Sequence, residues 1–189
     1  LHARPADIEK VKGRYQDGWD AMRETRLKRQ RDMGLIDSAW DLSPRDSRIK
    51  SWQETPQHPW QERRMEVYAA QVEQLDRGIG RIVAALKARG RLENTLLLFL
   101  ADNGGCAEEI TSGWKSLTIP EKTRDGREVK NGNNPKMLPG PEVTYQSYGL
   151  PWANASNTPF LLYKHHVHEG GISSPLIAHW PAGLSGKGV

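Results

Sequence analysis

Two adjacent oxygen donors, Asp102 and Asn103, follow the continuous apolar run 95–101, which is typical of a buried strand. Carboxylate and amide oxygens are the ligands that calcium and magnesium prefer in proteins. Gly104 and Gly105 come next and allow the backbone to turn sharply beside the donors. Because sites in open α/β sheets form at the carboxyl ends of strands, this position favours a functional role, for which a divalent-metal site is one interpretation. An Asx turn that merely ends the strand is the alternative interpretation.

A second group of polar residues follows the short apolar piece 159–163. Lys164 stands directly after it, before a turn rich in His and Gly. A lysine in such a turn can contact an anionic group as a point charge, whereas an ordinary surface lysine is the alternative. His165 and His168 are candidates for a pocket wall, because imidazole can act as an acid or a base near neutral pH. The spacing of the histidines matches no common zinc pattern, and Cys106 is the only cysteine of the chain.

The composition narrows the class of protein. The chain has 189 residues, of which 37% are hydrophobic, and a net charge of +4, which suits about one polar domain. A single cysteine excludes an intrachain disulfide framework, and no apolar run approaches the ~20 residues of a membrane span. We expect no nucleic-acid partner, because the basic residues near the N-terminus alternate with acidic ones and read as a solvated helix face. These basic residues are Arg23, Arg26, Lys28, Arg29 and Arg31.

Helices are expected in two regions. Residues 6–36 read as a helix in two pieces, interrupted at Gly13 and Gly18. The strongest pattern predicts a helix over 60–89, closed by Gly90, with an apolar stripe on one face. Two glycines inside it indicate a close approach to a neighbouring element. The stripe consists of Met65, Tyr68, Val72, Leu75, Ile79, Ile82 and Leu86.

The remaining chain predicts two strands and a long loop. The run 95–101 reads as a strand buried on both faces, as in a parallel sheet covered by helices. Residues 175–181 read as a second short strand. Residues 106–158 have no clear period, and so long an irregular stretch is usually a functional loop. The fold class is therefore α/β.

Taken in order, these pieces resemble the sulfatase family of the alkaline-phosphatase-like superfamily. Residues 148–159 are similar to the bacterial arylsulfatase branch. The resemblance implies part of an α/β/α sandwich with a mainly parallel sheet. The segments that carry it are 68–82, 94–105, 148–159, 163–164, 168–172 and 175–181.

The resemblance also implies roles for individual residues. Asp102 and Asn103 match the paired metal ligands of the family, usually for Ca²⁺ with Mg²⁺ as the alternative. Lys164 matches the lysine that contacts the sulfate group of a small-molecule or glycan sulfate ester. One departure is that the usual Gly-Gly-Ile/Val-Arg-Val-Pro lacks its Arg in residues 170–175.

The nucleophile of the family is not found in this sequence. It is a hydrated formylglycine, formed within a Cys/Ser-x-Pro-x-Arg motif that is absent here. Cys106 is followed by Ala-Glu-Glu and is not the modified residue. We therefore expect an internal fragment of one sulfatase catalytic domain that does not hydrolyse sulfate esters alone, from a periplasmic or secreted protein. Its expected segments are 1–60 (helix and loop), 61–105 (helix, strand and metal motif), 106–158 (active-site loop) and 159–189 (sulfate-contacting lysine and strand).

Two other functions stay open. A phosphate or phosphonate ester hydrolase of the same superfamily would share the metal chemistry. A binding protein without catalysis would retain only the scaffold and use 106–158 and the basic N-terminal helix as its surface. The substrate, whether an aryl sulfate, a sulfated glycan or a steroid sulfate, is not predicted by the sequence.

Overall fold

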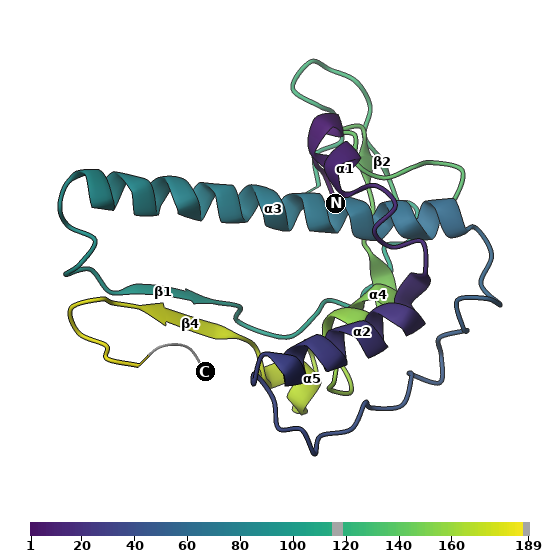
Figure 1. The fold of residues 1–189 in the computed structure, drawn as a ribbon. Coiled ribbons are helices and arrows are strands. Elements are labelled where there is room, and N and C mark those ends of the chain that lie inside the picture. Colours follow the sequence, from purple (N-terminus) through teal and green to yellow (C-terminus); the bar gives the residue numbers. More distant parts are fainter. Residues whose placement is uncertain (115–118, 187–189) are drawn as a thin grey trace.

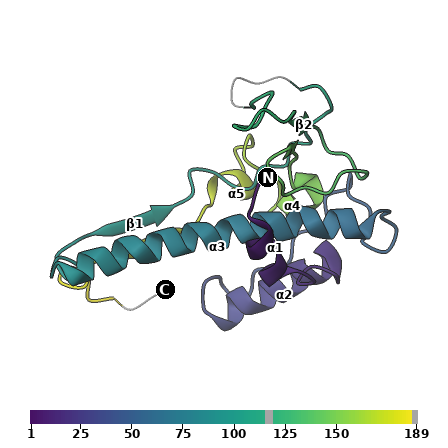
Figure 2. The ribbon, with the colours of Figure 1, turned by 90° about the horizontal axis from the view of Figure 1, so that it is seen from above.

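The computed structural model describes residues 1–114 and 119–186. Its longest element is the helix α3, which runs through the middle of the molecule (Figure 1). Within these residues the chain forms five helices and four strands. Figure 2 shows α1 and α2 on one side of α3, and β1 and β2 on the other. The elements are α1 Pro5–Val11, α2 Gly18–Asp32, α3 His58–Ala88, β1 Leu97–Leu100, β2 Lys130–Asn131, β3 Thr144–Tyr145, α4 Gly149–Ser156, α5 Glu169–Ile172 and β4 Leu176–His179.

The two N-terminal helices confirm the predicted helix in two pieces. Gly13 lies between α1 and α2, and Gly18 is the first residue of α2. Both have positive φ angles, 77° and 76°. A Cβ atom on Gly18 would lie 2.1 Å from the ring of Trp52, so this turn needs glycine for both its backbone angle and its close contact. The prediction of a fully solvated basic face on α2 is wrong for Arg23. Its guanidinium is buried and donates to the carbonyl oxygen and hydroxyl of Ser43.

Helix α3 confirms the strongest sequence pattern. It spans 31 residues and ends as predicted, with Gly90 at a positive φ angle of 63° directly after the cap residue. Its two internal glycines, however, lie beside open space in the described structure. None of the described residues comes within 4 Å of the positions that a Cβ atom would take on Gly78 or Gly80, so they do not show the close approach predicted there.

Three tryptophans form the centre of the core. Trp19 of α2, Trp52 of the following loop and Trp152 of α4 meet with ring centroids 4.8, 5.4 and 5.9 Å apart. The indole N–H of Trp19 donates to the carbonyl of Lys50, and that of Trp152 donates to the carbonyl of Gln61. Burial of these three large rings joins α2, α3 and α4 into one packed body.

The strands form two small sheets. β1 pairs with β4 in antiparallel register, with Leu98 opposite Ala178 and Leu100 opposite Leu176, and β2 pairs with β3 in parallel. These elements confirm the α/β class, whereas the sandwich with a mainly parallel sheet stays a prediction. The expected burial of 95–101 on both faces is wrong here. Leu98 and Leu100 are each 57% exposed, because none of the described elements covers this sheet.

The interval 106–158 is not one irregular loop, which corrects another expectation. It contains β2, β3 and α4, and the last of these carries part of the core. Pro151 occupies the first turn of α4, where proline is tolerated. The helix was not predicted because proline usually indicates that a helix ends. Residues 115–118 of the interval and 187–189 of the C-terminal segment lie outside the described residues. No helix among the described residues is long and apolar enough to cross a bilayer.

Candidate functional site

The two predicted metal donors lie at the end of β1, where the sheet gives way to a loop. Asp102 is exposed, and within the described residues no hydrogen bond or ion pair engages its carboxylate. The amide nitrogen of Asn103 donates to the carbonyl of Gly104 at 2.8 Å, which leaves the amide oxygen as the donor atom for a cation. Two hard oxygen donors fit Ca²⁺ or Mg²⁺, but they are fewer than the roughly six to eight ligands that Ca²⁺ takes.

No larger metal cluster accompanies these donors in the part of the chain that the structure describes. That part holds no group of three or more His, Cys, Asp or Glu side chains placed so that they could hold a metal ion. The described residues therefore neither support nor contradict a metal site beyond this pair of oxygen donors. Asp102 and Asn103 keep their assignment as metal ligands as a prediction.

Two glycine pairs bring the end of β1 against the C-terminal segment. The backbone N–H of Gly104 donates to the carbonyl of Gly171 at 2.9 Å. A Cβ atom on Gly104 would lie 1.7 Å from the carbonyl oxygen of Gly170, and one on Gly170 would lie 2.1 Å from that of Leu161. Backbones can approach so closely only where side chains are absent, so both pairs are needed at this junction.

Lys164 is held at the same junction. Its backbone N–H donates to the carbonyl of Gly105 at 3.2 Å, which places it beside the loop that begins with the metal donors. Its ammonium lies 3.2 Å from the carboxylate of Glu108, and its side chain is mostly shielded from solvent. Partial burial works to lower the pKa of Lys164, but the hydrogen bond and charge of Glu108 outweigh it and raise the pKa, so the lysine is kept in its charged form.

Glu108 connects a cluster of four side chains, which we call the Glu108 cluster: Cys106, Glu108, Lys164 and His165. Its carboxylate lies 2.6 Å from Nε2 of His165 and accepts a hydrogen bond from the thiol of Cys106 at 3.1 Å. The hydrogen bonds from His165, Cys106 and Lys164 lower the pKa of Glu108 to about 2. Burial and the neighbouring carboxylate raise the pKa of the Cys106 thiol, which disfavours the reactive thiolate.

The two histidines named from the sequence have different positions. His165 joins Lys164 at Glu108, so the structure brings these two predicted site residues together. His168 caps α5 through its backbone carbonyl, which accepts from Gly171 N–H at 2.7 Å, and its side chain is exposed with no recorded contact in the described chain. The structure therefore favours His165 over His168 as a neighbour of the lysine.

A hydrogen-bonded group that includes the buried Tyr163 lies next to Lys164 in the chain. The hydroxyl of Tyr163 donates to Asp46 at 3.0 Å, and Arg48 binds the same carboxylate through two nitrogens at 2.9 and 2.6 Å. Hydrogen bonds from Arg48 keep the pKa of Asp46 far below its ordinary value. This group anchors the residue preceding Lys164 to the loop that packs around the tryptophan core.

Sequence reasoning missed two residues of the junction, Glu108 and Asn157. Nothing in the local sequence of Glu108, which follows Cys106 and Ala107, distinguishes it from a surface carboxylate. Asn157 follows α4 and hydrogen-bonds to both glycine-rich segments. The glycine pairs were a usable signal, because two such pairs indicate backbones that meet, although they do not name the side chain between them.

Comparison with known proteins fits this geometry. The sequence profile of the sulfatase family matches residues 2–187. The chain belongs to the sulfatase family. It is 38% identical over 177 residues to an uncharacterized sulfatase of Schizosaccharomyces pombe, covering 92% of this chain and 31% of that protein. It is 33% identical over 192 residues to an arylsulfatase of Klebsiella aerogenes, covering 100% of this chain and 38% of that protein.

The profile match and these sequence identities confirm the resemblance to sulfatases that we inferred from the motifs. The chain spans about a third of the length of both relatives. The paired donors Asp102 and Asn103, the two glycine pairs and Lys164 all lie within the part that the sulfatase profile covers.

Proposed function

We propose that the protein carrying this chain is a sulfuric ester hydrolase of the arylsulfatase type. The observation that supports it best is the backbone junction between the Asp102–Asn103 loop and Lys164, in a chain of the sulfatase family. It sets two oxygen donors for a cation and one ammonium group on adjoining segments. Such a set suits the binding of a small tetrahedral anion, because a bound cation and a fixed ammonium group would both attract its negative oxygens.

Lys164 is the residue of this chain that we assign to the sulfate group. Hydrolysis of a sulfate ester increases the negative charge on oxygens around sulfur, and a fixed cation in a shielded site stabilises that charge. Glu108 keeps the ammonium charged and oriented before the substrate arrives. Because Glu108 is itself anionic, it also favours release of an anionic product by competing for the lysine.

Asp102 and Asn103 would hold the divalent cation, whose chemistry when bound is Lewis-acid polarisation and charge neutralisation. Their side chains suit this role because neither oxygen donor is engaged by a cationic side chain in the described chain. His165 is the pocket residue that we propose beside Lys164, since it contacts the same carboxylate.

The nucleophile is proposed to lie outside this chain, as a formylglycine in the rest of the protein. Cys106 is unsuited to the role, because its pKa is raised and its thiol donates to a carboxylate. A periplasmic or secreted location belongs to the same proposal. Aryl, glycan and steroid sulfates all remain within the proposed substrate class.

Turnover of an aryl sulfate by the protein that carries this chain tests the proposal. We expect hydrolysis that chelation of divalent ions abolishes and added Ca²⁺ restores. Asp102→Asn should reduce kcat/KM by at least about 100-fold, because it removes a charged metal ligand, whereas Asp125→Asn, on an exposed loop, should leave it unchanged. Residues 1–189 alone should show no turnover.

A substrate panel separates this proposal from the rival functions. A clear preference for aryl phosphate or phosphonate over aryl sulfate would favour the phosphohydrolase alternative. A folded protein without hydrolysis of any ester, with unchanged ligand binding after Asp102→Asn, would favour a binding function and contradict the proposal.

A further inference from the structure

We propose that Asn157 is a positioning residue that fixes the metal-donor loop relative to Lys164. The inference rests on the proposed function, because it assigns Asn157 a role at that same site. The side-chain hydrogen bonds of Asn157 in the described residues go to backbone atoms and not to the side chains of Asp102, Asn103 or Lys164. Its action would pass entirely through the backbone of the segments that carry the functional groups.

The side chain of Asn157 makes three hydrogen bonds, and all of them go to those segments. Its Oδ1 accepts from Gly105 N–H at 2.8 Å, on the loop that begins with Asp102. Its Nδ2 donates to the carbonyl of Leu162 at 2.8 Å, two residues before Lys164, and to that of Gly170 at 2.7 Å. One amide group thus joins Gly105 to two backbone positions, Leu162 and Gly170, of the segment that carries Lys164.

The amide is mounted on a rigid base. Asn157 caps the C-terminus of α4, and its backbone N–H donates to the carbonyl of Ala153 at 3.0 Å. Trp152, Ala153 and Ala155 of this helix are fully buried. Any movement of Asn157 would therefore disturb the tryptophan core, so the side chain carries the rigidity of the core to the junction.

The contact between Gly105 and Asn157 is tight. A Cβ atom on Gly105 would lie 2.9 Å from Asn157 Oδ1, so the loop approaches the amide this closely only with glycine at position 105. Aspartate has the same shape but cannot donate, so it would set a carboxylate against the carbonyl oxygens of Leu162 and Gly170. Alanine would leave one N–H and two carbonyl groups without their side-chain partner. Asparagine is thus the side chain whose size and polarity this position requires.

Loss of these bonds should loosen the site more than the fold. The backbone bond from Lys164 N–H to the Gly105 carbonyl and the one from Gly104 N–H to the Gly171 carbonyl would remain, so the segments would stay near each other. Their relative position would no longer be set by the core. Supporting residues that orient metal ligands typically change affinity or activity by about 10–100-fold when replaced.

The test uses Asn157→Ala and Asn157→Asp in the protein that carries this chain. The matched control is Asn133→Ala. Asn133 is another half-buried amide, and in the described residues its side chain bonds to Glu109 and Ser147 but to none of Asp102, Asn103, Lys164 and the glycine pairs. For each protein we would measure the dissociation constant of Ca²⁺ by calorimetry, kcat/KM for an aryl sulfate, and stability to denaturant. Hydrogen exchange at the Gly105 amide reports the junction directly.

Both Asn157 variants should bind Ca²⁺ about 10–100-fold more weakly than the wild type and lose kcat/KM to a similar extent. Asn133→Ala should lose stability but keep both quantities. Asn157→Asp retains an acceptor for Gly105 N–H, so it should keep exchange at Gly105 slow while still weakening the site. That variant also serves if the alanine protein does not fold.

Two failures are distinguishable. If the wild type binds Ca²⁺ and hydrolyses aryl sulfate, but folded Asn157 variants do so as well as Asn133→Ala, the positioning role is overturned and the proposed function stands. If the wild type neither binds Ca²⁺ nor hydrolyses the ester, the proposed function and the role of Asn157 within it are both overturned.

Discussion

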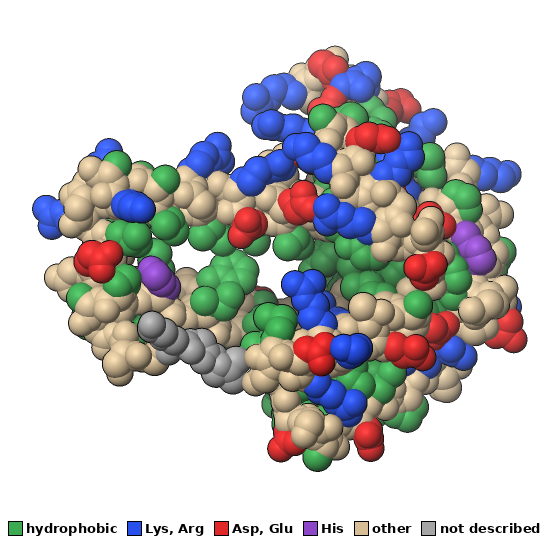
Figure 3. Space-filling view, in the orientation of Figure 1, with side chains coloured by type: hydrophobic (Ala, Val, Ile, Leu, Met, Phe, Trp, Pro, Cys, Tyr) green, Lys and Arg blue, Asp and Glu red, His purple; other side chains and the backbone are tan. Residues whose placement is uncertain are grey.

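The two halves of α3 carry one continuous apolar stripe but differ in what covers it. In the N-terminal half, Met65 is 4% exposed and Tyr68 stacks on Tyr148 with ring centroids 4.7 Å apart. In the C-terminal half, Leu75 is 52% exposed and Ile82 is 58% exposed. Figure 3 shows apolar side chains along this second half, facing a hollow on the side of the β1–β4 pair.

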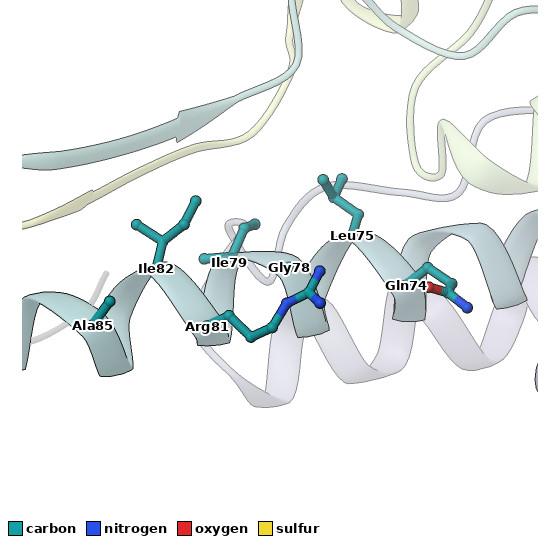
Figure 4. A pocket seen from close by; sticks show the side chains of 7 residues that line it. All are labelled: Gln74, Leu75, Gly78, Ile79, Arg81, Ile82 and Ala85. Atoms are coloured by element: carbon teal, nitrogen blue, oxygen red, sulfur yellow. The ribbon is translucent and has the colours of Figure 1, made fainter.

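The uncovered half of α3 and the β1–β4 pair together form one apolar region. Figure 4 shows Leu75, Ile79 and Ile82 pointing to the side on which β1 and β4 run, next to the open position of Gly78. Leu98, Leu100 and other side chains of the strands are exposed as well. The comparison teaches that the spacing of apolar residues defines which face of a helix is apolar, but not which element covers it.

The strongest test of the packed region is Trp152→Ala. The ring is fully buried at the centre of the tryptophan core, so its removal should lower the free energy of unfolding by about 3–5 kcal/mol. Denaturant unfolding of residues 1–189 measures this. The control Trp114→Ala removes an exposed ring and should change the free energy by less than about 0.5 kcal/mol. Equal losses would contradict the assigned core.

Met65→Ala and Ile82→Ala compare the two halves of the stripe directly. Met65→Ala should lower the free energy of unfolding by about 2–5 kcal/mol, because it leaves a cavity in the packed half. Ile82→Ala should be neutral or raise it by a few tenths, roughly 0.4 kcal/mol, because alanine favours an exposed helix. Similar losses in both variants would mean that the second half is covered in solution.

Acid should weaken the Glu108 cluster. The folded-state pKa of Glu108 is about 2, below its ordinary value of 4.5, so its stabilisation is present above pH 4.5 and is lost as the pH falls toward 2. Because the side chain is 42% exposed, solvent screening limits the effect to roughly 0.5–1 kcal/mol.

Glu108→Gln measures that contribution by unfolding near neutral pH and at about pH 3. The difference between the two conditions should shrink relative to the wild type. Glu93→Gln, on an exposed turn before β1, is the control and should leave the difference unchanged. An unchanged pH dependence in Glu108→Gln would show that the cluster does not stabilise the fold.

The smallest change is expected in the β1–β4 pair. Leu176→Thr replaces an exposed apolar side chain and should alter the free energy of unfolding by no more than about 0.5 kcal/mol. It should also reduce the binding of a hydrophobic dye, because less apolar surface is exposed. A loss as large as that of Met65→Ala would contradict the exposed position of this strand.

Much of the fold followed from the sequence, but not all of it. The sequence predicted α1, α2, α3, β1 and β4, because each of these elements has a local hydrophobic period or a clear terminus. Helix α4 was missed because Pro151 reads as a helix breaker, and β2 and β3 span only two residues each. Burial of 95–101 failed because it depends on neighbouring elements.

The site divides in the same way. The types and order of Asp102, Asn103 and Lys164 were enough to name them as candidates and to identify the family. Their partners were not, because Glu108 and His165 are 57 residues apart and Asn157 and Gly105 are 52 apart. Contacts of that separation depend on the full path of the chain.

Local spacing therefore predicted the helix faces, the glycine turns and the chemistry of the donors, since these depend on residues within one or two turns of each other. Only the tertiary structure decided that Glu108 holds Lys164, that Asn157 joins the two glycine pairs, and that half of the apolar stripe is uncovered. The physical reason is that hydrogen bonds and burial across the fold require two backbones to meet. Their meeting is decided by packing around Trp19, Trp52 and Trp152 rather than by any local pattern.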